Sequence, residues 1–258
     1  KKKKNIYKKN SKIKIRNRIK HFFMFDNQLG FSFPIETFLY PKSIILEKEI
    51  DMILQEIEND YNKKNDIKRL GKIKKFEILQ KKATLLLAFY SGLRKNELRS
   101  RLIDDVSLFG NKLVIDVNYE GLSKIKLKLK TRSAKRRVEI YINNPLHLKI
   151  ISEFIKTRND LCKQSNFLFL EVSNNKIYSK IASEELIITL NNYIKNITLR
   201  YCTFHSLRHS FATYQINDLL KNKLEYPYAI LQLSMMMGHE NPEITITNYI
   251  HFDFLRLL

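Results

Sequence analysis

The sequence predicts a mainly α-helical protein that carries a small three-stranded antiparallel β-sheet. Apolar residues recur at helical spacing over most of the chain, and the spacing changes to strict alternation only between Lys112 and Ile142. A hydrophobic content of 44% in 258 residues is ordinary for a folded protein and suffices for one good core or two small ones. We therefore expect a mostly helical body with one small sheet.

The N-terminal residues form a basic segment. Residues 1–25 contain no Asp or Glu and are rich in Lys and Arg, which is typical of an arm that contacts a polyanion or of a disordered tail. The stretch from Phe22 to Phe38 is rich in Phe and is interrupted by Gly30 and Pro34. This pattern indicates extended chain docked on a core, and not an independent domain.

Two helices are expected next. The first begins at Glu47, and the second ends at Gly92, a residue type common just past helix ends. Arg94 then opens the following turn. The apolar residues at helical spacing are Ile50, Ile53, Leu54 and Ile57 in the first helix, and Phe76, Leu79, Ala83, Leu86 and Leu87 in the second.

Alternating apolar residues predict the three strands of the sheet. They are Leu113, Ile115 and Val117, then Ile125, Leu127 and Leu129, then Val138, Ile140 and Ile142. The middle strand would place a row of lysines on its opposite face, and the turn to the third strand adds further basic residues. These residues are Lys124, Lys126, Lys128 and Lys130, followed by Arg132, Lys135, Arg136 and Arg137. We expect this basic hairpin to contact DNA.

Helical spacing returns after the sheet. The apolar positions are Leu148, Ile151, Phe154 and Ile155, then Leu186, Ile187, Leu190 and Ile194, then Leu207, Phe211 and Tyr214. An apolar helix from Tyr228 to Met237 is expected to stop at Gly238. Asn241 and Pro242 have the N-cap and first-turn chemistry of one more helix, with Tyr249 on it or just past it.

The charge of the chain indicates a polyanionic partner. Lys plus Arg outnumber Asp plus Glu by 47 to 26, which leaves a formal charge of +21. Duplex DNA is the favoured partner because a basic surface binds it by releasing counterions, and a membrane surface is the rival. No apolar run is long enough to span a bilayer. Two cysteines without metal or disulfide spacing favour a reducing compartment, so we expect a cytoplasmic, nucleoid-associated protein.

A set of polar residues has the chemistry needed to cut a phosphodiester. The planar guanidinium groups of Arg94 and Arg208 can bind phosphate oxygens with paired hydrogen bonds. The Tyr249 phenol can attack phosphorus and form a covalent ester that keeps the bond energy. His205 and His239 can move or orient protons near neutral pH.

The motifs around these residues resemble those of the tyrosine recombinase, or phage integrase, family. They are the segment 91–98 (SGLRKNEL), the segment 205–213 (HSLRHSFAT), Met237-Gly238-His239 and Tyr249-Ile250-His251. The resemblance covers residues 44–258, the whole catalytic domain of that family, and implies the tyrosine recombinase catalytic-domain fold. It also implies that residues 1–43 are a basic arm or linker, a remnant too short for the helical DNA-binding domain of the family.

The resemblance assigns a role to each residue. Arg94 and Arg208 would bind the scissile phosphate, His239 would hydrogen-bond to it, His205 would serve proton transfer, and Tyr249 would form a 3′-phosphotyrosine. Glu97 would brace Arg94. The leaving 5′ oxygen would be protonated by a lysine, for which Lys130 is our first choice and Lys128 and Lys135 are alternatives. Neither metal nor cofactor is expected, and a homotetramer on two double-stranded DNA sites, monomeric without DNA, would be the working assembly.

Three other functions are compatible with parts of the sequence. His205 and His209 are four residues apart, as zinc-binding histidines are, but Ser206 follows the first where a zinc protease needs Glu. A DNA-binding protein without catalysis would explain the charge but not the motifs. A topoisomerase of type IB would share the phosphotyrosine step and would relax supercoils without pairing two sites.

Overall fold

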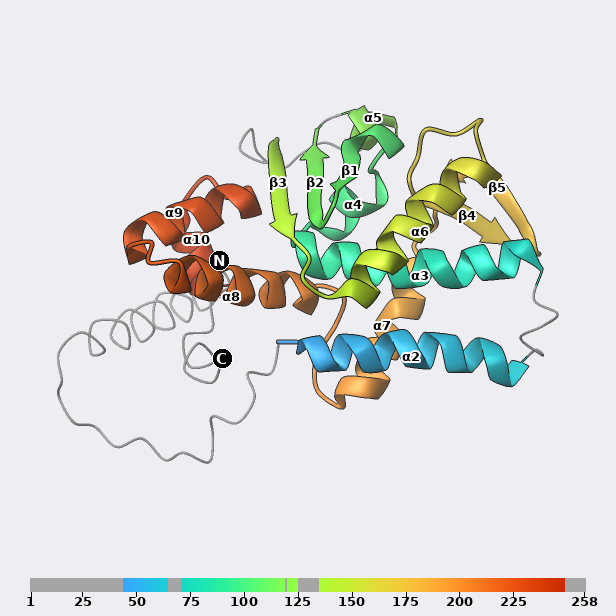
Figure 1. The fold of residues 1–258 in the computed structure, drawn as a ribbon, viewed down its shortest axis with the longest axis horizontal. Coiled ribbons are helices and arrows are strands. Elements are labelled where there is room, and N and C mark those ends of the chain that lie inside the picture. Colours follow the sequence, from blue (N-terminus) through green and yellow to red (C-terminus); the bar gives the residue numbers. More distant parts are fainter. Residues whose placement is uncertain (1–43, 65–70, 119, 125–134, 249–258) are drawn as a thin grey trace, which may run out of the picture.

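The computed structural model describes residues 44–64, 71–118, 120–124 and 135–248. In chain order the elements are α2 (Glu47–Lys64), α3 (Lys72–Ser91), α4 (Lys95–Arg99), the 3-10 turn η3 (Ile103–Asp105), β1 (Val106–Phe109), β2 (Lys112–Val117), α5 (Glu120–Lys124), β3 (Arg136–Tyr141), α6 (Pro145–Leu161), β4 (Leu170–Ser173), β5 (Lys176–Ile181), α7 (Glu185–Thr198), α8 (Ser206–Lys221), α9 (Tyr226–Met237) and α10 (Pro242–Asn248). The predicted fold class, mainly helical with a small antiparallel sheet, is confirmed (Figure 1).

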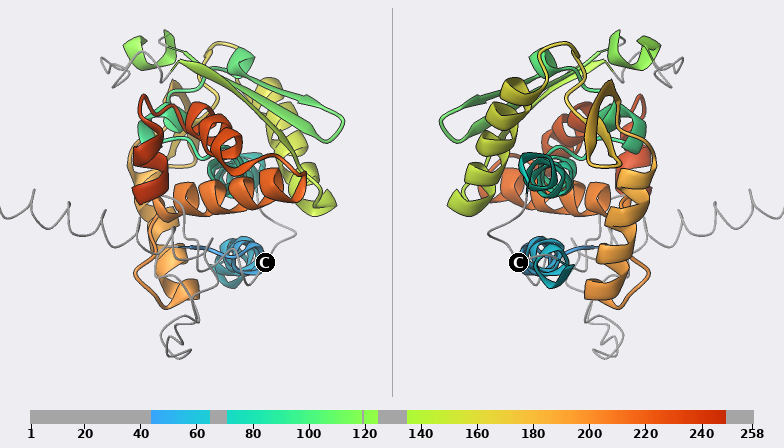
Figure 2. Two further views of the ribbon diagram at one scale, coloured as in Figure 1. Left: turned by 90° about the vertical axis from the view of Figure 1, so that its left-hand side faces the viewer. Right: turned by 90° about the vertical axis from the view of Figure 1, so that its right-hand side faces the viewer.

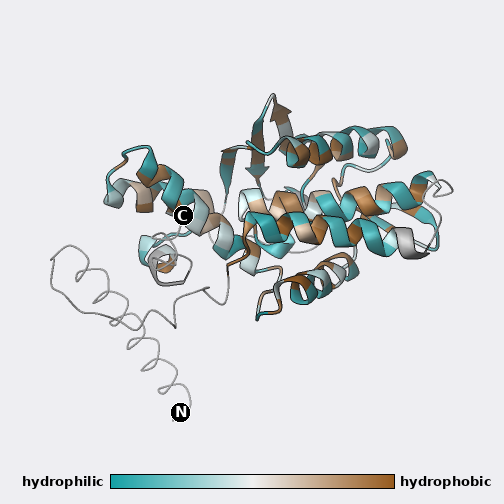
Figure 3. Ribbon diagram, turned by 60° about the horizontal axis from the view of Figure 1, so that its bottom comes forward, coloured by the Kyte–Doolittle hydropathy of each residue, from teal (hydrophilic) through white to brown (hydrophobic). Residues whose placement is uncertain are grey.

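Helix α3 forms the centre of the molecule. It packs against α2, α6, α7 and α8, and Figure 2 shows it end-on with these helices around it. Its second half, from Ala83 to Phe89, is buried on every side, which is the pattern of a helix enclosed by others. The outer helices carry both hydrophobic and hydrophilic residues (Figure 3), as expected when only one face is buried.

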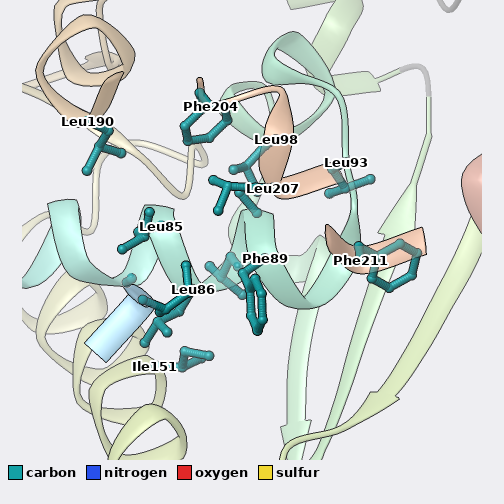
Figure 4. Close-up of a cluster of buried hydrophobic side chains, with 14 of the residues drawn as sticks. Leu85, Leu86, Phe89, Leu93, Leu98, Ile151, Leu190, Phe204, Leu207 and Phe211 are labelled. Carbon is teal, nitrogen blue, oxygen red and sulfur yellow. The ribbon is translucent and has the colours of Figure 1, made fainter. Parts of the chain in front are cut away.

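The core fixes the two arginine motifs relative to each other. Leu86 and Phe89 of α3, Leu207 and Phe211 of α8, and Leu93, next to Arg94, belong to one buried cluster (Figure 4). Gly92 between α3 and α4 has a left-handed φ of 59°, and a Cβ there would collide with the Phe211 ring. Close packing of this kind holds α8 against the loop between α3 and α4.

The sheet has the predicted number of strands, but the predicted middle strand is wrong. The order is β1-β2-β3, and β2 pairs directly with β3, with Leu113 opposite Ile140, so residues 125–129 do not lie between them. The third member is β1, which a two-residue turn at Gly110-Asn111 joins to β2. Lys124 ends the short helix α5 and is not on a strand. Residues 125–134 lie outside the described part of the chain.

A second hairpin, formed by β4 and β5, was not predicted. Its strands are antiparallel, and its turn residues Asn174 and Asn175 have positive φ values of 49° and 55°. Two residues with positive φ are characteristic of the type I′ turn that joins hairpin strands, and Asn tolerates this conformation. The dipeptide was therefore a local signal for the hairpin.

The predicted helices are present near their expected positions. Helix α2 begins at Glu47, α3 stops at Gly92, and α9 stops at Gly238, whose φ of 67° gives a left-handed end. Asn241 caps α10 by accepting the Glu243 backbone N–H at 2.8 Å. None of the helices in the described residues is long and apolar enough to cross a bilayer.

Candidate active site

A buried carboxylate lies at the centre of the candidate site. Glu97 of α4 binds the Arg94 guanidinium at 2.7 Å through Oε1 and the Arg136 guanidinium at 3.0 Å through Oε2. Its Oε2 also accepts the Arg94 backbone N–H at 3.0 Å. The contact expected between Glu97 and Arg94 is therefore present, and Arg136 from β3 is a second partner that the sequence did not indicate.

The charges around Glu97 keep it ionised. Burial alone would raise the pKa of this carboxyl, but Arg136, then Arg94 and Arg208, lower the pKa to about 2. One negative charge thus faces three guanidinium groups. The excess of positive charge suits the binding of an anion.

Arg208 joins three parts of the chain. Its Nη1 donates to the Gly92 carbonyl at 2.5 Å, and its Nη2 donates to the Met237 carbonyl at 2.6 Å and to His239 Nε2 at 3.0 Å. The residue is only 1% exposed. Because it binds the backbone after α3 and at the end of α9, Arg208 holds both helix ends at the site.

His239 is neutral at physiological pH. Burial, followed by the charges of Arg208, Arg94 and Arg136, lowers the pKa of its imidazole to about 3. Its Nδ1 lies 2.7 Å from Thr245 Oγ1, on the fully buried Thr245 of α10. The structure thus brings Arg94, Arg208 and His239 together, as the sequence predicted.

His205 occupies a more open position. It is exposed and immediately precedes the first residue of α8, three residues before Arg208 in the sequence. Its ring makes an edge contact with that of His209, with 5.2 Å between centroids. Among the described residues, no group of three or more His, Cys, Asp and Glu side chains could hold a metal ion.

Arg136 is not at the surface, where we expected the basic residues of the hairpin to lie. Its side chain is only 5% exposed, and its Nε donates to the Met236 carbonyl at 2.6 Å in addition to the pair with Glu97. The reason lies in the β2–β3 register, since residues alternate between the two faces of a strand. Arg136 points inward, whereas the neighbouring Arg137 is exposed and binds both oxygens of Asp116.

The other predicted residues have varied positions. Lys135 is exposed just before β3, and Lys124 is exposed and pairs with Glu120 at 3.3 Å. The remaining predicted residues lie outside the described residues. They are Lys126, Lys128, Lys130, Arg132 and Tyr249.

Comparisons with known proteins agree with this fold and identify the family of the chain. A model of the phage integrase family matches residues 45–256, and the chain belongs to this family of tyrosine site-specific recombinases, a class of enzymes that transfer DNA strands. Tyrosine recombinase XerA from Pyrococcus horikoshii is 29% identical over 167 residues, which are 65% of this chain and 49% of that protein. The chain therefore spans about half the length of this curated relative.

Solved structures show the same fold. A XerH site-specific recombinase bound to palindromic difH substrate, in a post-cleavage complex, matches with a TM-score of 0.53 and 20% identity over 83% of this chain and 51% of that one. The crystal structure of a XerA recombinase matches with a TM-score of 0.52 and 18% identity over 88% of this chain and 67% of that one. At such identities the likeness concerns the fold.

Proposed function

We propose that this chain contains the catalytic domain of a site-specific DNA recombinase or integrase, in residues 44–258. The observation that carries the proposal is the cluster of Arg94, Arg136 and Arg208 around a single carboxylate, with the neutral His239 bound to Arg208. A phosphodiester that is attacked in such a site gains negative charge on its oxygens, and fixed guanidinium groups stabilise that charge. The family of the chain supports the same reaction.

In this reaction the Tyr249 oxygen attacks the scissile phosphorus. The bond from phosphorus to the 5′ oxygen breaks, a 3′-phosphotyrosine forms, and the leaving oxygen takes up a proton as a 5′ hydroxyl. A 5′ hydroxyl of a partner duplex then attacks the phosphotyrosine and restores the tyrosine. No outside energy source is needed, because the number of phosphoester bonds stays constant.

The described residues have distinct tasks in this proposal. The side chain of Arg94 is 23% exposed, so its guanidinium is the one that the phosphate meets first. Arg208 binds the same phosphate from the buried side. His205, being exposed, serves proton transfer at the surface of the site. Lys130 protonates the leaving 5′ oxygen, with Lys128 and the exposed Lys135 as alternatives.

The family and the charge of the chain support a proposal for the partner and the assembly. The XerH structure contains a difH DNA substrate, and the charge of +21 suits double-stranded DNA for this chain as well. We propose integration or excision of a mobile element by a homotetramer on two DNA sites, in the cytoplasm and at the nucleoid. Residues 1–43 and the basic residues Lys124, Lys126, Lys128, Arg132, Lys135 and Arg137 would contribute DNA contacts.

The decisive test is covalent capture on DNA. A nicked duplex that carries a candidate site from flanking DNA traps the phosphotyrosine, because the cut fragment diffuses away. The wild type is expected to form the covalent complex and Tyr249→Phe to form none, while Tyr228→Phe, which changes an exposed tyrosine, behaves like the wild type. Capture by Tyr249→Phe would contradict the nucleophile assignment, and relaxation of supercoils without strand exchange would favour a topoisomerase.

Arg208→Ala tests the phosphate-binding role. Loss of one donor to a developing oxyanion costs about 2.7–4 kcal/mol, so single-turnover cleavage is expected to fall about 10²- to 10³-fold. DNA affinity in a gel-shift assay is expected to change much less. Normal cleavage by this variant would refute the assignment.

Arg136 is proposed as a positioning residue. It connects Glu97 with the Met236 carbonyl, and so links α4 to the helix that ends beside His239. Arg136→Lys is expected to slow cleavage with little change in DNA affinity, because one ammonium cannot make both contacts in the geometry of a guanidinium. Arg99→Lys is the matched control, since Arg99 also bonds to a carbonyl, Ala182, and a carboxylate, Glu184. Equal cleavage by the two variants would remove Arg136 from the mechanism.

A further inference from the structure

The hydrogen bonds of His239 define which of its ring nitrogens carries the proton. A guanidinium can only donate, so the contact of 3.0 Å from Arg208 Nη2 requires an unprotonated Nε2. The ring is neutral, and its single proton is therefore on Nδ1. The contact of 2.7 Å to Thr245 Oγ1 is then a bond that Nδ1 donates and the hydroxyl accepts.

In this arrangement His239 cannot donate a hydrogen bond to a phosphate. Phosphate oxygens only accept hydrogen bonds, and Nε2 has no hydrogen to donate. The Nη2 of Arg208 carries two hydrogens, and both are used, by the Met237 carbonyl and by His239. In this structure His239 and Arg208 thus satisfy each other.

Moving the imidazole proton from Nδ1 to Nε2 would change both groups at once. Nε2 would become a donor, and the Arg208 hydrogen that now points to it would be available to the phosphate. Adding a second proton is the other route to an Nε2–H. The charged groups that face the ring oppose it, because Arg208 of α8, Arg94 before α4 and Arg136 of β3 outweigh the single Glu97.

We propose that Thr245 is a positioning residue that lets His239 exchange tautomers when a phosphate binds. Its hydroxyl accepts from Nδ1 in the DNA-free state and donates to Nδ1 once Nε2 carries the proton, since a hydroxyl can do either. Nδ1 gives its proton to water and Nε2 takes one from water, so the charge of the ring is unchanged. This inference rests on the proposed function.

The position of Thr245 links this exchange to the nucleophile. Thr245 is fully buried on α10, four residues before Tyr249 in the sequence. The same hydroxyl therefore fixes the His239 ring against the helix that leads to Tyr249. If a methyl group replaced the Thr245 hydroxyl, it could neither accept a hydrogen bond from Nδ1 nor donate one to it.

Nitrogen NMR of the full chain tests the resting tautomer without DNA. Histidine labelled with ¹⁵N, with His239→Gln for assignment, is expected to show His239 neutral at pH 7 with the proton on Nδ1. Thr245→Val is expected to alter the two nitrogen shifts of His239, whereas Thr84→Val, which also removes a buried hydroxyl, leaves them unchanged. A resting Nε2–H tautomer, or a doubly protonated ring at pH 7, would overturn the proposal.

Single-turnover cleavage of the nicked duplex tests the exchange itself. Thr245→Val is expected to cleave at least about tenfold more slowly, the rate equivalent of one hydrogen bond, with unchanged DNA affinity. Thr245→Ser keeps the hydroxyl and is expected to restore cleavage, and Thr84→Val to match the wild type. Thermal unfolding of each variant verifies that it is folded.

The outcomes separate this inference from the proposed function. If the wild type and Thr245→Val cleave equally, the role of Thr245 is refuted and the function stands. If the wild type forms no covalent complex on any site, the proposed function fails, and the NMR result still decides the resting tautomer. A Thr245→Ser variant as slow as Thr245→Val would also refute the role of the hydroxyl.

Discussion

Replacing Glu97 by Gln removes the one carboxylate that faces the arginines of the site. The side chain of Glu97 is only 6% exposed and binds both Arg94 and Arg136. Glutamine has nearly the shape of the protonated acid, so the substitution removes the charge and leaves the packing. Two guanidinium groups then lose their counter-charge in a buried place, which is strongly destabilising.

The pKa of Glu97 gives the size of the effect. The value falls from its ordinary 4.5 to about 2, and at about 1.4 kcal/mol per pKa unit this corresponds to about 3 kcal/mol of stability. Because the folded-state pKa is the lower one, this stability is fully present above pH 4.5. It is lost as the pH falls towards 2.

Urea unfolding followed by circular dichroism measures this difference. At pH 7 Glu97→Gln is expected to unfold with a free energy about 3 kcal/mol below that of the wild type, and the two curves are expected to converge as the pH falls from about 4.5 towards 2. Glu184→Gln is the matched control, because Glu184 also bridges two cations, Lys95 and Arg99, but its side chain is 57% exposed. Its loss is expected to be much smaller.

Equal stability of Glu97→Gln and the wild type at pH 7 would refute the reasoning. A difference that did not change between pH 5 and pH 2 would do the same, because it would show that the charge of Glu97 is not its source.

Two further substitutions test the core around the site. Gly92→Ala is expected to lose about 3 kcal/mol, because the new Cβ meets the Phe211 ring and the backbone φ is left-handed. Gly110 also has a left-handed φ, but a Cβ there would meet no atom within 4 Å, so Gly110→Ala is expected to lose only about 1 kcal/mol. Equal losses of stability by the two glycine variants in thermal unfolding would contradict this. Gln80→Leu leaves the backbone N–H and C=O of Leu170 without their side-chain partner, each bonded at 2.8 Å, and is expected to lose about 3 kcal/mol in urea. The exposed Gln55→Leu serves as its control, and a similar loss there would show that the contact with Leu170 is not responsible.

The helices were predictable because their signals are local. Spacing of apolar residues and the glycines at 92 and 238 are properties of a few neighbouring residues, and each helix began or stopped near the place they indicate. The sheet was only partly predictable. Alternation identified β2 and β3, but strand pairing joins distant residues, and the two-residue turn that brings β1 into the sheet was overlooked.

The candidate site shows the same limit. Arg94, Arg208 and His239 were recognised from motifs, and the structure brings them together. Arg136 was interpreted as a surface residue, because a run of basic residues does not reveal which one faces inward. Only its pairing with Glu97 and Met236 shows that it belongs to the site.

The sequence by itself determined the helical class, the positive charge and the residue types that phosphodiester chemistry requires. Only the tertiary structure decided which cation shares a buried carboxylate, and that Arg208 and Thr245 contact the two ring nitrogens of His239. The physical reason is that charge and hydrogen-bonding capacity belong to each side chain. Burial, direction and partner depend on where packing places side chains that are distant along the chain.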